Sequence, residues 1–154
     1  MVALVRLLPE RDPHRALFET LAVLVDHLDD RDLAPALFVR FELAVLAELG
    51  FGLDLARCAA TNTTEDLAYV SPKSGRAVCA MAGEPYRDRL LLLPAFLTGR
   101  SGASHPSRDD VAAGFRLTDF FLRQNVFEPR GETPPEERAR FVALATKAAD
   151  RNRF

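Results

Sequence analysis

Two cysteines at the ends of a short, turn-rich segment are the first residues in this chain that point to chemistry. Cys58 follows a helix-like stretch that ends on glycines, and Cys79 closes a probable hairpin, LAYV-SPKSG-RAVC. Structural zinc takes four thiolate or imidazole ligands, usually as two close pairs. Cys58 is followed by AAT and Cys79 by AMA, so the second cysteine of each pair is missing. The segment has the outline of a zinc finger with half of its ligands, and we expect no metal and no other cofactor.

The histidines do not complete such a site, because His14, His27 and His105 all lie far from both cysteines in the sequence. We expect apolar packing and hairpin hydrogen bonds to replace the metal. A Cys58–Cys79 disulfide is the alternative if the two ends of the segment are adjacent, although a reducing compartment disfavours it.

Catalytic motifs are absent from the sequence. It contains no G-x-S-x-G, P-loop or HExxH pattern. The acidic pair Glu136-Glu137 stands at a predicted helix start, where the helix dipole accounts for it. We expect a protein that is not an enzyme.

Two groups of residues could bind a partner. Lys73 and Arg76 flank the predicted hairpin turn and could contact phosphate, or could simply keep a turn soluble. A run of phenylalanines with nearby arginines could form an apolar groove with a basic rim, or the phenylalanines could be ordinary core. The run comprises Phe115, Arg116, Phe120, Phe121, Arg123 and Phe127.

Size and composition indicate one soluble globular domain, residues 1–154. The chain has 154 residues, of which 48% are hydrophobic and 27% charged. No apolar run approaches the roughly 20 residues of a membrane span, and the opening MVALVRLLP lacks the features of a signal peptide. The net charge of −2 divides into −6 for residues 1–70 and +4 for residues 71–154. A basic C-terminal part can attract phosphate or an acidic peptide.

The apolar periodicity predicts a mainly α fold, a helical bundle-like domain with a small β-hairpin insert at about 54–86. A first helix begins at Asp12-Pro13 and buries Leu17, Leu21, Leu24 and Leu28; a second runs from Pro35 to Gly50. A short helical segment over 86–97 is interrupted by Pro94. Ser107 and Asp110 form a capping box for a third long helix to about Val126, and Thr133-Pro134-Pro135-Glu136 caps a last one to Lys147.

Three stretches of the sequence carry a family resemblance. FELAVLAELGFGLDLARC (41–58), DLAYVSPKSGRAV (66–78) and PYRDRLL (85–91) occur in the order and spacing of the RecO family of bacterial DNA repair and recombination proteins. The chain resembles the helical part of that family, with a degenerate zinc finger. Nothing before residue 12 resembles the oligonucleotide-binding (OB) barrel that precedes this part, so we expect that barrel, and its single-strand binding, to be missing.

The resemblance implies a recombination mediator that helps to load the recombinase and to anneal single strands. Its implied partners are RecR, the acidic C-terminal tail of the single-strand DNA-binding protein, and single-stranded DNA. Together with the residue patterns above, it leads us to expect tail contact at Phe115, Arg116, Phe120 and Arg123, and weak DNA contact at Lys73 and Arg76. We expect a cytoplasmic, nucleoid-associated site of action away from membranes. The alternative is a helical protein-interaction domain that does not bind DNA.

Overall fold

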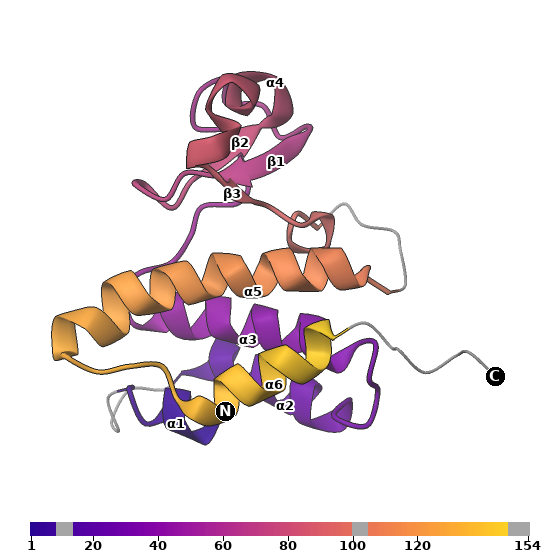
Figure 1. Ribbon diagram of the computed structural model, residues 1–154, viewed down its shortest axis with the longest axis vertical. Coiled ribbons are helices and arrows are strands. Elements are labelled where there is room, and N and C mark those ends of the chain that lie inside the picture. The colour runs from indigo at the N-terminus through magenta and orange to yellow at the C-terminus, as the bar shows by residue number, and fades with distance from the viewer. Residues whose placement is uncertain (9–13, 100–104, 148–154) are drawn as a thin grey trace.

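Long helices stack in layers, and a small β-containing insert stands on one side of them (Figure 1). The computed structural model describes residues 1–8, 14–99 and 105–147. Helix α5 separates the insert from α3, α2 and α1 (Figure 1). The mainly α class with a small β insert is confirmed.

Helices α2 (Arg15–Asp26) and α3 (Ala34–Glu48) form the predicted helical hairpin. Pro35 lies in the first turn of α3, where a missing N–H costs nothing, and Gly50 follows the helix at φ 88°. The predicted start at Asp12-Pro13 lies outside the described residues. Leu17 and Leu24 are buried as predicted and Leu21 is half-buried, but Leu28 lies beyond the helix and is 46% exposed.

Helix α5 (Arg108–Leu122) begins at the predicted capping box. The Ser107 hydroxyl accepts the Asp110 N–H, and the Asp110 carboxylate accepts the Ser107 N–H. Gly114 brings α5 close to α3, because a Cβ there would lie 3.0 Å from Val39 Cγ1. The helix continues as a π-helical turn, Arg123–Phe127, so the predicted end near Val126 falls within that turn.

Helix α6 (Glu136–Thr146) packs against α5, and the short α1 (Val2–Val5) packs against α3. The start of α6 differs from the prediction. Pro135 occupies its N-cap position with no side-chain hydrogen bond, so Thr133 does not cap it. Proline at this point still fixes the backbone angle that leads into a helix.

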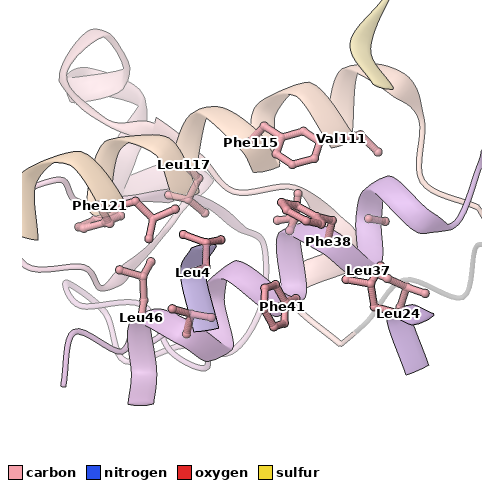
Figure 2. Close-up of a cluster of buried hydrophobic side chains, with 14 of the residues drawn as sticks. Leu4, Leu24, Leu37, Phe38, Phe41, Leu46, Val111, Phe115, Leu117 and Phe121 are labelled. Atoms are coloured by element: carbon pink, nitrogen blue, oxygen red, sulfur yellow. The ribbon is translucent and has the colours of Figure 1, made fainter. Parts of the chain in front are cut away.

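The core surrounds α3, which packs against α5 on one side and against α2 on the other (Figure 2). Phe41, Leu46 and Leu117 are each fully buried there, and Leu4 of α1 lies among them. Phenylalanine rings continue this core toward α6, with the ring centroids of Phe38 and Phe141 4.9 Å apart.

The insert contains one more strand than the sequence predicts. Strands β1 (Leu67–Val70) and β2 (Ala77–Cys79) form the expected antiparallel hairpin, and β3 (Leu91–Leu92) pairs with the other edge of β1. In the sequence, α4 (Ala80–Gly83) and a 3₁₀ turn, Glu84–Arg89, connect β2 to β3. The predicted helical segment over 86–97 is therefore wrong in its middle, because pairing with β1 extends the backbone at Leu91 and Leu92.

Candidate functional site

A groove of about 840 Å³ runs between α5 and α6. Its floor and walls are mostly apolar, and its charged lining residues are three arginines with Asp119 and Glu128. The lining comprises Leu91, Ala112, Phe115, Arg116, Asp119, Phe120, Arg123, Gln124, Glu128, Pro134, Arg138, Ala139, Val142, Ala143 and Thr146. Pockets of this size and character commonly bind a ligand or a peptide side chain.

The four residues predicted for partner binding all line this groove. Phe115 and Arg116 lie in the middle of α5, Phe120 follows one turn later, and Arg123 begins the π-helical turn. Phe115 is only 2% exposed and forms floor and core at once. Phe120 is half-buried, so part of its ring is open to a partner.

The other two phenylalanines of the run belong to the core, as the alternative interpretation had it. Phe121 and Phe127 are both 3% exposed, and neither lines the groove. The ring of Phe121 supports that of Phe120, with centroids 5.2 Å apart in an edge-to-face arrangement.

The three arginines of the groove are in different electrostatic states. Arg123 Nε lies 2.7 Å from one oxygen of Asp119, and Arg138 Nη1 lies 2.7 Å from the other. Arg116 is exposed and forms no ion pair with the residues that the structure describes. Arg116 is therefore the arginine best able to bind an incoming carboxylate.

A buried ion pair holds the wall of the groove in place. Glu42 of α3 is completely buried, and its carboxylate accepts hydrogen bonds from Arg138 and from the Thr118 hydroxyl. Burial raises the pKa of Glu42, against the effect of those bonds. Burial lowers the pKa of Arg138, but the bonds to Glu42 and Asp119 reverse this and leave it above its ordinary value. Arg138 stays charged and ties α6 to α3.

Sequence reasoning missed the α6 side of the groove. Arg138 and Val142 are separated from Phe115 by a turn and a helix start, and nothing local indicates that they face it. One signal was available: a glutamate inside the apolar face of α3 needs a cationic partner if it is buried. The partner, 96 residues away, could not be identified from the sequence.

The predicted DNA-contacting residues lie away from the groove, at the hairpin turn. Lys73 is exposed at its tip, whereas the Nε of Arg76 lies 3.5 Å from an oxygen of Asp54. Gly75, at φ 67°, is packed against Leu53 and Phe121, which fixes the turn to the helical part. Lys73 is thus the freer of the two cations.

The two cysteines meet inside the insert, but they do not fit a zinc ion. The Cys79 N–H donates to the Cys58 sulfur over 3.2 Å, and both are free thiols. Burial raises the pKa of the Cys58 thiol, but hydrogen bonds from Thr61, Cys79 and Ala60 outweigh this and lower the pKa to about 6. Among the described residues, no three His, Cys, Asp or Glu side chains gather to hold a metal. Two sulfurs are half of a structural zinc site.

Comparison with known proteins identifies the family. Residues 1–134 match the model described as "Recombination protein O C terminal". The chain belongs to the RecO family. It is 64% identical over 148 residues to a DNA repair protein RecO of Methylorubrum extorquens, covering 94% of this chain and 60% of that protein. It is 57% identical over 146 residues to RecO of Sinorhizobium medicae, covering 95% of this chain and 58% of that protein.

The match places this chain in the C-terminal part of RecO proteins, and the chain spans about three fifths of the length of these relatives. No solved structure matches it. Within the described part of the chain, no helix has the length and apolar character needed to cross a membrane. The α5–α6 groove therefore lies in a chain that matches the C-terminal part of RecO proteins.

Proposed function

We propose that this chain is the partner-docking part of a RecO-type recombination mediator. Its groove binds the acidic, phenylalanine-terminated tail of the single-strand DNA-binding protein. The observation that carries the proposal is that Phe115, Arg116, Phe120 and Arg123 line one apolar groove with a basic rim. A terminal phenyl ring would enter over Phe115 while arginine binds the carboxylate.

This role fits a mediator without bond chemistry of its own, working with RecR and single-stranded DNA at the bacterial nucleoid. Phosphate contact would fall to Lys73 and Arg76, neither of which lines the tail groove. DNA and tail could then bind together. The contribution of Arg76 would be the smaller, since Asp54 already neutralises it.

A peptide titration tests the groove. A fluorescent peptide with acidic residues and a terminal phenylalanine should bind the wild-type chain with a dissociation constant on the order of micromolar, because a short flexible tail loses freedom on docking. Arg116→Ala should weaken binding about tenfold, the value of one charge-assisted hydrogen bond. Arg140→Ala is the matched control, since Arg140 lies on the same pair of helices but outside the groove.

Two results would contradict the proposal. Equal affinity of the Arg116→Ala and Arg140→Ala variants for the peptide would show that the tail does not bind in the groove. Undiminished binding of a peptide that lacks the terminal phenylalanine would show that the apolar part of the groove does not recognise the tail. The folded state of each variant is checked by circular dichroism.

The second candidate function is a protein-interaction domain without DNA contact. A salt titration of single-stranded DNA binding separates the two, because neutralised phosphates give a steep log–log slope. A slope that falls on Lys73→Ala favours the DNA-contacting mediator. Absence of any DNA binding alongside normal tail binding favours the pure docking domain.

A further inference from the structure

Two backbone turns of the insert begin at Cys58 and Cys79, although the side chains around them do not fit zinc. In the first turn the Cys58 carbonyl accepts the Asn62 N–H at 2.9 Å, and the Cys58 N–H donates to the Thr63 carbonyl at 2.8 Å. Asn62 lies in the left-handed region at φ 61°, a conformation uncommon outside glycine. The second turn starts at Cys79, which is the N-cap residue of α4.

Each cysteine sulfur contacts the turn that the other cysteine begins. The Cys58 sulfur accepts the Cys79 N–H at 3.2 Å, and the Thr61 hydroxyl lies 3.6 Å from the Cys79 sulfur. Thr61 is three residues after Cys58, which is the spacing of the second ligand in a C-x₂-C pair. By the same spacing, Ala82 of α4, three residues after Cys79, occupies the second ligand position of a pair that begins at Cys79. Both sulfurs are buried.

We propose that this pair of turns is a metal centre that has become metal-free. The Cys58 sulfur holds the turns together as a hydrogen-bond acceptor, and Thr61 and Ala82 stand at the two lost ligand positions. A metal ion and a buried acceptor sulfur can serve the same purpose here, since each ties backbone on both turns to one point. The proposal does not depend on the tail groove or on DNA binding.

Restoring the two ligands tests the proposal directly. The double variant Thr61→Cys/Ala82→Cys of the whole chain should bind about one cobalt(II) per chain with the spectrum of a tetrahedral thiolate site. Chelator should then lower its melting temperature, because metal binding is linked to folding. The control Ala59→Cys/Ala80→Cys has the same number of thiols at exposed positions with the wrong spacing, and it should not give that spectrum.

Three outcomes would overturn the proposal. They are a folded Thr61→Cys/Ala82→Cys variant that binds no cobalt, a control that binds it equally well, and a wild-type chain that already holds stoichiometric zinc. The last would mean that Cys58 and Cys79 are still ligands.

A second measurement covers the case in which the double variant does not fold. Cys58→Ala removes the acceptor sulfur, so the Cys79 amide should exchange hydrogen about tenfold faster, the effect of losing one hydrogen bond. Cys79→Ala keeps both the acceptor and the N–H donor, so the same amide should stay protected. Equal exchange in the two variants would show that the Cys58 sulfur does not hold the turns together.

Discussion

At the scale of single residues, Asp119 decides how much of the positive charge in the groove is available. Its two oxygens are each 2.7 Å from an arginine, one on Arg123 and one on Arg138. Because Arg138 is also bound to buried Glu42, Asp119 chiefly reduces the charge that Arg123 presents to a ligand. Among the described residues, no carboxylate forms an ion pair with Arg116, so its charge is available to a ligand.

The variant Asp119→Asn should therefore bind an acidic tail more tightly. At a separation of about 7 Å, removing one negative charge that repels a carboxylate is worth about 0.6 kcal/mol in water, or about threefold in affinity. The gain should disappear near 1 M salt, where screening acts over about 3 Å. Calorimetry at low and high salt measures both effects.

Glu136→Gln provides the control, since it makes the same charge change on an exposed part of α6 outside the groove. An equal gain in both variants would indicate a long-range charge effect. Weaker binding by Asp119→Asn would indicate that Asp119 holds Arg123 in its binding orientation.

At the scale of elements, the attachment of α6 depends on one buried polar contact as well as on aromatic packing. Arg138 bridges Glu42 of α3 and Asp119 of α5, and the ring of Phe141 contacts those of Phe38 and Phe115. The apolar contacts draw the helix onto the core, whereas the ion pair fixes which turn of α6 faces α3.

Breaking this pair from one side should be costly. Arg138→Met leaves Glu42 buried without a cation and should lower the free energy of unfolding by about 3–5 kcal/mol, measured by urea denaturation. The double variant Glu42→Leu/Arg138→Met should recover most of that loss, because apolar residues of similar size can replace a buried pair. Thr118 would keep its hydrogen bond to the Phe115 carbonyl. A double variant as unstable as the single one would show that the pair itself stabilises the fold.

The sequence predicts well those elements whose cause is local. Ser107 and Asp110 are three residues apart and satisfy each other's backbone, so the start of α5 could be predicted from four letters. The hairpin turn likewise follows from Ser71-Pro72-Lys73-Ser74-Gly75. Strand β3 was missed because two residues carry no periodicity, and only pairing with β1 extends them. The groove was half predicted, since its α5 side lies in one helix and its α6 side depends on distant contacts.

At the scale of the whole molecule, α3 is the centre to which other parts of the fold are attached. It contacts α1, α2 and α5, and Phe41 on it is fully buried. Helix α2 is more peripheral, since Leu17 and Leu24 are its buried residues and Phe18 is 70% exposed. Phe41 should therefore contribute much more to the free energy of unfolding than Phe18.

Two substitutions test this distribution. Phe41→Ala should lower the free energy of unfolding by about 3–5 kcal/mol, because it leaves a cavity in the core. Phe18→Ser should change it by less than about 0.5 kcal/mol, as surface substitutions do. Chemical denaturation of both variants with a common slope gives the comparison. An equal loss of unfolding free energy in the two variants would mean that Phe18 is buried in solution and that α2 is not peripheral.

The separation of Glu42 from Arg138 has a consequence for the order of events during synthesis. The ribosome makes the carboxylate 96 residues before the guanidinium that will accompany it into the interior. At about 5–20 residues per second, the growing chain spends about 5–20 s with α3 complete and its cation not yet made. A carboxylate without a cation is costly to bury, so we expect the face of α3 that carries Glu42 to stay in contact with water until α6 is made.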